Sequence, residues 1–466
     1  MSKNNLESNR ENHQNKKGMK KYLTYLFLLV ISLMGTDLTD FALSLWVLGQ
    51  SELGISSYTQ ILFFEALPAV ALAPFIGSFV DRWNKKKMII YGQLVAGLGS
   101  IVLMTLFYLE QLLPWHIMII VSIGSVASMF IYTSFFVSSR ALVSKKELIK
   151  AQGMAAMLFA VVEVGVPIIA PFLYDLIGIG NIFLIDFVTF LVPLTAFLIL
   201  KFVVVPRSEE KFNIKNDFKL AFSFIKERKG LTSLIVFAFL FSAFYSAVQA
   251  LFAPLILDFS DENTLGKVMA FTALGTLIGG AVMSDDREYK NPVRAMGPLY
   301  FFMGVILSAL VFQVGLYTIA IAGMIVVLLF TIKETLDDAF ILTIVPVHMQ
   351  GRISGVLGLV IGLSGPVSIL FSGVLVDVIE PLIDKNQVTF LNHLPGTVTT
   401  TSIMIVIGLA GILMALIAIV FWWNNGIKQL GVLYRSELKK DADKESEEEN
   451  IEKIEDKLKE ELIKEL

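Results

Sequence analysis

Hydrophobic and polar positions along the chain are arranged in long alternating blocks. Apolar runs of about 20 or more residues are separated by short polar breaks, and a helix of that length matches the ~30 Å hydrocarbon core of a bilayer. Since the bilayer core holds no water to satisfy backbone groups, each run is expected to be helical. The pattern predicts twelve membrane-spanning helices, at residues 22–48, 56–80, 88–108, 116–137, 152–176, 181–205, 231–257, 265–284, 296–314, 316–345, 353–377 and 399–424.

Basic residues collect in alternate loops between these runs. Lys and Arg are frequent before the first run, after every second run and throughout residues 206–230. The intervening loops carry only Lys267 and Lys385, each close to acidic residues. Because Lys and Arg concentrate in short cytoplasmic loops, both termini are expected on the cytoplasmic side.

The longest internal polar stretch, residues 206–230, divides the predicted helices into two groups of six. Five of its apolar residues are predicted to form one face of a short amphipathic helix on the membrane surface: Phe218, Leu220, Ala221, Phe224 and Ile225. The expected organisation is a cytoplasmic tail (1–21), a six-helix bundle (22–205), a central cytoplasmic loop (206–230), a second bundle (231–425) and a charged cytoplasmic tail (426–466).

The two halves repeat a few features. Gly77 and Asp81 follow the second run, and Gly280 and Asp285 stand at the corresponding place of the eighth, about 200 residues later. Pro167 in the fifth run matches a Gly-Pro pair at 365–366 in the eleventh. Parallel repeats of this kind build many secondary transporters, which bind their substrate between the halves. The predicted fold is an all-α membrane protein of two pseudo-symmetric six-helix bundles.

The most specific local motif is residues 77–87, GSFVDRWNKKK. It resembles the loop between the second and third helices of the major facilitator superfamily, G-x-x-x-D-R-x-x-R/K-R/K, although Asn84 stands where many members have glycine. The resemblance implies that Gly77, Asp81, Arg82 and Lys86 form a conformational latch, with Asp81 capping the third helix or pairing with a base of the other half. An ordinary positively charged loop remains the alternative.

Three further segments resemble the branch of this superfamily that contains macrolide efflux proteins: 41–46 (FALSLW), 183–190 (FLIDFVTF) and 345–352 (VPVHMQGR). This resemblance implies proton-driven export of drugs or drug-like compounds. The fourth helix, however, lacks the arginine-glycine motif of many proton antiporters. The fifth carries Glu163-Val-Gly-Val-Pro167 in place of a glycine-rich motif, so coupling and direction stay open.

Charges inside the predicted spans are the main candidates for a mechanism, because each is costly unless it faces protein or water. Asp37 and Asp40 lie three residues apart on one face of the first helix. We predict that they contact the substrate or a proton, while a structural network of ion pairs is the alternative.

The tenth helix carries a second group, Lys333, Glu334, Asp337 and Asp338, within an arc of roughly 140°. Lys333 is predicted to pair with Asp337, which leaves Glu334 and Asp338 as neighbouring acids. Two such acids do not both ionise readily in a medium of low dielectric constant, which suits a proton carrier. In the resembled fold, helices 1, 4, 7 and 10 line the central cavity, so the two groups are expected to face each other across it.

Three acids stand singly. Asp186 is expected to be structural, whereas Glu65 and Glu163 either line the cavity or bond neighbouring helices. Most of the many aromatic residues are expected to pack or face lipid, with Tyr245 as the preferred binding residue because of its hydroxyl. Rings together with carboxylates suit an amphipathic cation.

Other function classes find no support in the sequence. It has no Cys, no Walker loop and only four scattered His, so no cofactor, metal or enzyme activity is expected. The predicted function is proton-coupled efflux of hydrophobic, cationic compounds by a monomer in a bacterial plasma membrane, with protons, a small-molecule substrate and the bilayer as partners and no nucleic acid. A metabolite or lysophospholipid carrier, and a transport-dead sensor or scaffold that signals through its acidic tail, are the alternatives.

Overall fold

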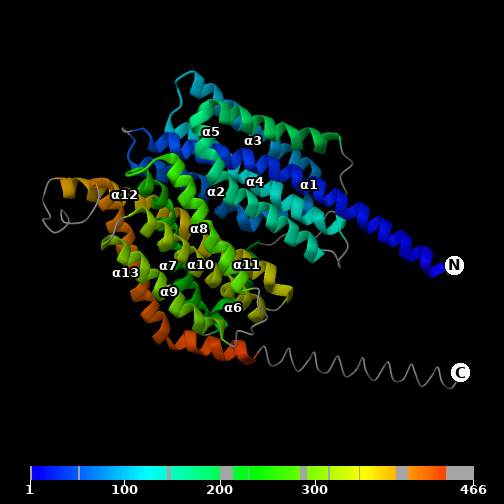
Figure 1. The fold of residues 1–466 in the computed structure, drawn as a ribbon. Coiled ribbons are helices and arrows are strands. Elements are labelled where there is room, and N and C mark those ends of the chain that lie inside the picture. Colours follow the sequence, from blue (N-terminus) through cyan, green and yellow to red (C-terminus); the bar gives the residue numbers. More distant parts are fainter. Residues whose placement is uncertain are drawn as a thin grey trace.

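Every secondary-structure element in the described part of the chain is a helix. The computed structural model describes residues 3–50, 53–143, 148–199, 214–228, 230–283, 291–312, 315–345, 347–384 and 397–436. Long helices pack side by side (Figure 1). They are α1 (Lys3–Leu48), α2 (Ile55–Arg82), α3 (Lys85–Tyr108), α4 (Pro114–Leu142), α5 (Leu148–Ile199), α6 (Ile214–Glu227), α7 (Leu231–Leu257), α8 (Glu262–Met283), α9 (Pro292–Ala309), α10 (Leu316–Ile344), α11 (Val347–Gly362), α12 (Ser364–Asp384) and α13 (Val398–Trp423), with a 3₁₀ turn at Leu310–Phe312.

Eleven segments of the described chain are long and apolar enough to cross a membrane. The longest, Met157–Ile199 in α5, has 43 residues, about twice what a bilayer requires. Helical geometry fails inside it at Gly178, where φ is 74° and ψ is 162°. Glycine adopts this positive φ without steric penalty. Gly178 therefore divides this apolar span into two segments, each about 20 residues long and able to span by itself.

The two ends of α5 lie beside the same part of α1. The hydroxyl of Tyr22 donates a hydrogen bond to the backbone oxygen of Ala151, at 3.1 Å. One turn later in α1, the ring of Tyr25 stacks on Phe197, with 5.3 Å between ring centroids. The chain therefore reverses at Gly178, and α5 holds both the fifth and the sixth predicted spans.

The helix pairings of the first half recur in the second. α1 packs against α5 and α2 against α4, as α7 packs against α12 and α8 against α10. α3 contacts α4 and α5, as α9 contacts α10 and α13. The buried apolar residues form two large clusters, one mainly from each half. This repetition is what two pseudo-symmetric bundles require.

The halves meet along two helix pairs, α2 with α12 and α5 with α8. A side-chain carbon added at Gly266 of α8 would lie 2.2 Å from the backbone oxygen of Pro167 in α5, so these backbones are in close contact. Nearby, the amide nitrogen Nδ2 of Asn263 donates to Oδ2 of Asp175, at 2.9 Å. These contacts join the halves on the side predicted to be extracellular.

Two predicted helices differ in extent from the helices of the structure. The apolar span predicted at 22–48 matches the span Gly18–Leu48, but its helix begins earlier, at Lys3, as the projecting first turns of α1 in Figure 1 show. No proline interrupts the polar stretch 3–21. The predicted helix 353–377 is two helices, α11 and α12, that meet at Leu363. Pro366 lacks the N–H that would bond the carbonyl of residue 362, which favours a break there.

The amphipathic helix predicted in the central loop is α6. Ala221, Phe224 and Ile225 are buried in the core of the C-terminal half, and Phe218 packs against it. The assignment of Leu220 to this face is wrong, since its side chain is 36% exposed. At about 100° per residue, Leu220 lies off the stripe of positions 218, 221 and 225.

Candidate functional site

A cavity of about 510 Å³ lies within the N-terminal half. Its lining comes from α1, α2, α3, α4 and the second segment of α5. It brings together four carboxyl groups, those of Asp37 and Asp40 in α1, Glu65 in α2 and Asp186 in α5. We call it the acidic chamber. The ring of Tyr132 from α4 also lines it.

Asp186 reaches the chamber because α1 and α5 approach closely at Gly35. A side-chain carbon added at Gly35 would lie 1.9 Å from Oγ1 of Thr189 and 2.9 Å from Oδ1 of Asp186. Only a residue without a side chain allows these two helices to meet here.

Hydrogen bonds hold the carboxyl of Asp186 in place. The hydroxyl of Ser100 in α3 donates to its Oδ2 at 2.6 Å, and the hydroxyl of Thr36 in α1 to its Oδ1 at 3.5 Å. The side chain is buried, at 5% exposure. These bonds tie α1, α3 and α5 together, which agrees with the expected structural role, and they also place a carboxyl on the chamber wall.

The charged residues that line the chamber are all acidic. None of the described residues that line it is Lys or Arg. Four negative charges in a partly desolvated space repel one another strongly, so the chamber needs protons or a cation to lower its energy. No group of three or more His, Cys, Asp or Glu in the described chain is arranged to hold a metal ion.

One wall of the chamber is apolar and reaches the outer surface of the bundle. Val95, Leu98 and Val102 of α3 and Ile123 of α4 line it, and all four side chains are exposed. A second cavity of about 480 Å³ on α2, α3 and α4 shares Val95 and Ile123, and its lining is almost entirely apolar. The acids thus lie next to an exposed apolar surface that hydrophobic molecules can contact.

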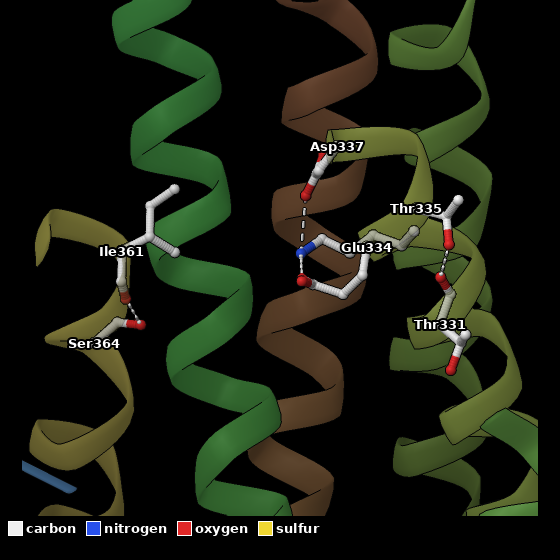
Figure 2. Close-up of polar contacts among 7 residues, drawn as sticks. Thr331, Glu334, Thr335, Asp337, Ile361 and Ser364 are labelled. Carbon is white, nitrogen blue, oxygen red and sulfur yellow. Dashed lines mark hydrogen bonds and ion pairs between the residues drawn. The ribbon is translucent and has the colours of Figure 1, made fainter. Parts of the chain in front are cut away.

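The charges of α10 form an ion-pair cluster inside the C-terminal half. Lys333 is only 3% exposed, and its Nζ lies 2.9 Å from Oδ2 of Asp337 and 2.5 Å from Oε1 of Glu334 (Figure 2). The predicted pair of Lys333 with Asp337 is confirmed. The expectation that Glu334 stays unpaired is wrong, because the lysine ammonium lies between both carboxylates. Asp338 is exposed on the same helix.

Tyr245 of α7 lies close to this cluster. Its ring stacks on Phe330 of α10, with 3.6 Å between centroids, and its hydroxyl accepts a hydrogen bond from Nε2 of Gln249 at 3.1 Å. It lines a cavity of about 70 Å³ that belongs to the C-terminal half. It is also within electrostatic range of Glu334 and, from the other half, of Glu163.

The acidic chamber does not include the second predicted charge group. None of its lining residues comes from α10, and Lys333 is buried within its own half. That the two groups face each other across a central cavity between the halves stays a prediction. Glu163 is exposed on α5, within electrostatic range of both Asp37 and Tyr245.

The predicted latch is described in part. The side-chain surroundings of Gly77 and Asp81 lie outside the part of the chain that the structure describes. Arg82 ends α2, and Nζ of Lys86 donates to the backbone oxygen of Leu198 at 3.3 Å. The expected capping of the third helix by Asp81 is wrong, because Asn84 is the N-cap.

Oδ1 of Asn84 accepts a hydrogen bond from the backbone N–H of Lys87 at 3.1 Å. Asparagine is a preferred N-cap residue. This cap gives a physical reason for asparagine at the position where many sequences of the resembled pattern have glycine.

The family model of the Major Facilitator Superfamily matches residues 25–369. The chain belongs to this superfamily. Macrolide efflux protein A of Streptococcus pyogenes is 24% identical over 322 residues, which cover 67% of this chain and 78% of that protein. Macrolide efflux protein A of Enterococcus faecalis is 24% identical over 314 residues, covering 65% and 96%.

Solved structures show the same fold. A bacterial homologue of the human lysosomal transporter Spinster, in an inward-facing and unoccupied conformation, matches with a TM-score of 0.63 at 14% identity, covering 89% of this chain and 98% of that one. The nucleoside transporter NupG matches with a TM-score of 0.64 at 11% identity, covering 90% and 99%. At such identities these likenesses concern the fold alone. The protein is thus a multi-pass membrane transporter of the major facilitator fold, not an enzyme.

Proposed function

We propose that this transporter exports hydrophobic, cationic small molecules across a bacterial plasma membrane in exchange for protons. The observation that carries the proposal is the acidic chamber, in which four carboxyls and no base line a space next to an apolar wall. Such a site attracts the charge of an amphipathic cation through its acids and the apolar part through its wall.

Asp37 and Asp40, with Glu65, bind the cation or the proton in this proposal, and the ring of Tyr132 contacts the bound cation. The same carboxylates cannot hold a proton and a cation at once, so binding of one displaces the other. This competition is the simplest basis for antiport. Export as the direction is supported by the similarity to the two macrolide efflux proteins.

Glu163 and Tyr245 are proposed to connect the chamber with the cluster on α10. Glu334 is half exposed, at 49%, although it is paired with Lys333. In this proposal Glu334 and Asp338 carry the proton, while Asp337 pairs with the lysine. Gly77, Asp81, Arg82 and Lys86 are proposed as the latch between conformations. Cytoplasmic termini, a monomeric state and proton coupling belong to the same proposal.

A carrier of anionic metabolites or lysophospholipids is the second candidate. Its support in the sequence is Lys333, which could bind an anionic group. In the structure Lys333 is buried and pairs with two carboxylates, so this support is weak. The third candidate, a scaffold that signals through its tail, concerns residues 437–466, which lie outside the described chain.

The proposal is tested by equilibrium binding of a fluorescent lipophilic cation to the purified protein at several pH values. If each bound cation displaces one proton, the affinity rises up to tenfold per pH unit over the range in which the chamber holds the proton. Asp37→Asn/Asp40→Asn should weaken binding and flatten this dependence. Glu110→Gln, in an exposed acid of the α3–α4 loop, is the matched control. A pH-independent affinity in the unmodified protein would refute the exchange.

A further inference from the structure

A basic cavity lies where α9 begins and the chain leaves α13. Its volume is about 360 Å³, and its lining includes Arg294 of α9 together with Lys428 and Arg435 of the helical segment 425–436. No lining residue is acidic. In the described part of the chain none of these three bases forms an ion pair, so their charges are not neutralised there.

The position of these bases is fixed by the packing around them. Nε of Arg435 donates to the backbone oxygen of Gly431 at 3.1 Å. A side-chain carbon added at Gly431 would lie 2.6 Å from Nδ2 of Asn291, the residue that caps α9. Ile427 and Leu430 are buried in the core of the C-terminal half. Segment 425–436 is therefore held firmly against the start of α9, and this packing fixes the walls of the cavity between them.

The other part of the cavity is apolar and lies at the end of a membrane-spanning helix. Trp422, 45% exposed, and Val432, 60% exposed, both line it. The span of α13 ends at the neighbouring Trp423, which is 75% exposed. Tryptophan is enriched at membrane–water boundaries. The cavity thus combines positive charge with apolar surface at the depth where phospholipid headgroups lie, on the side predicted to be cytoplasmic.

We propose that this cavity binds the phosphate of an anionic phospholipid from the cytoplasmic leaflet. Arg294 and Arg435 supply planar donors that suit phosphate oxygens, and Lys428 adds a third charge. The upper part of an acyl chain then lies along Trp422 and Val432. Basic pockets on the cytoplasmic side of membrane helices bind such headgroups. The site is separate from the acidic chamber, which lies in the other half.

The acidic tail of the chain itself is a competing occupant. It starts at residue 437, next to Arg435, and its net negative charge is opposite to the positive charge of the cavity. Its first stretch, residues 437–450, is polar apart from Leu438 and Ala442, so it offers less apolar surface than an acyl chain does. A phospholipid satisfies both the basic and the apolar parts, and this decides the proposal in its favour.

The test is the thermal unfolding of the full-length protein in neutral detergent, titrated with phosphatidylglycerol, with phosphatidylcholine or with free glycerol phosphate. We expect phosphatidylglycerol to raise the unfolding midpoint in a saturable manner, and the other two to raise it little. In Arg294→Gln/Lys428→Gln/Arg435→Gln the apparent affinity for phosphatidylglycerol should fall roughly a hundredfold, because each base near an anionic headgroup contributes about a factor of five.

The matched control is Lys219→Gln/Lys226→Gln, which removes two exposed bases from α6 and leaves the cavity intact. Equal responses in control and triple variant would overturn the proposal. So would stabilisation by glycerol phosphate as strong as that by the lipid, or a lipid response that appears only when residues 437–466 are deleted. If the triple variant does not fold, Lys428→Gln alone should weaken the lipid response about fivefold, and an unchanged response would overturn the proposal.

Discussion

At the scale of single residues, the acidic chamber depends on acids from three different helices. Asp37 and Asp40 share one helix face, so their proximity follows from helical geometry. Glu65 and Asp186 join them through packing, with Gly35 as the contact point of α1 and α5. Each residue makes a separate and testable contribution.

Glu65 is expected to act in cation binding although it stands alone in the sequence. Because its carboxyl lines the same chamber as Asp37 and Asp40, Glu65→Gln removes one of the four negative charges there. We expect the affinity for a lipophilic cation to fall about tenfold, as for the loss of one partly buried charge interaction of ~1.4 kcal/mol. Binding titrations check this, with Glu110→Gln as control; an unchanged affinity would place Glu65 outside the binding site.

Gly35 is expected to tolerate no side chain. Gly35→Ala places a methyl group against Thr189 and Asp186, and overpacking of this kind costs about 1–3 kcal/mol. The unfolding midpoint of the detergent-purified variant should therefore fall. Gly165→Ala is the matched control, since nothing lies within 4 Å of an added carbon there. A midpoint equal to that of the control would show that α1 and α5 are not in close contact at this position.

Lys333 is expected to be needed for stability because its positive charge pairs with two carboxylates. Lys333→Met leaves Asp337 and Glu334 without their cation, and breaking a buried pair from one side costs about 3–5 kcal/mol. Adding Asp337→Asn should recover part of this loss. Thermal unfolding of the single and double variants provides the comparison, and identical midpoints for both would contradict the ion-pair account.

Residue-level prediction from sequence succeeds where contacts are local. The pair Lys333–Asp337 follows from helical spacing. The contact of Lys333 with the adjacent Glu334 does not, because it depends on how the flexible lysine stem folds within its surroundings. The grouping of Glu65 with Asp37 could not be predicted either, since no spacing rule connects two helices.

At the scale of elements, apolar run length locates the helices, and local chemistry decides where they break. The break in α5 lies at Gly178, between the two runs that hydrophobicity separates. The break between α11 and α12 lies inside one apolar run, where Gly362, Gly365 and Pro366 are the local signals. The helical continuation of α1 through residues 3–17 has no hydrophobic signal at all.

The α6 helix offers a test of its packed face within one element. Phe224 is 4% exposed in the core of the C-terminal half, whereas Leu220 is 36% exposed. Phe224→Asp buries a charge and should cost more than about 3 kcal/mol, while Leu220→Asp should stay within about 0.5 kcal/mol of the unmodified protein. Unfolding midpoints measure both. Equal effects would mean that α6 is not docked on the core.

At the scale of the whole molecule, two equivalent halves are joined by α2 with α12 and α5 with α8. Alternating access in such folds comes from one half rocking against the other around a central site. The contact of Asp175 with Asn263 then exists in only part of the cycle. The position of the acidic chamber inside one half was not predictable from sequence, because it depends on how five helices pack.

A cross-link between the halves should stop transport. The chain has no Cys, so Asp175→Cys/Asn263→Cys introduces a single pair of thiols at a place where the native side chains are 2.9 Å apart. A short, reducible thiol-reactive cross-linker should join the halves and abolish flux in proteoliposomes, and a reducing agent should restore it. Each single Cys variant is the control. Full flux in the cross-linked protein would show that the halves do not separate here.

The central claim, exchange of a cation for protons at the chamber acids, is tested most directly by transport in proteoliposomes. The measurement follows a fluorescent lipophilic cation and the internal pH together, with and without an imposed pH gradient. We expect gradient-driven cation movement with opposite proton movement, lost in Asp37→Asn/Asp40→Asn and kept in Glu110→Gln. Cation movement that is the same with and without the pH gradient, or that persists in the double variant, would contradict the account.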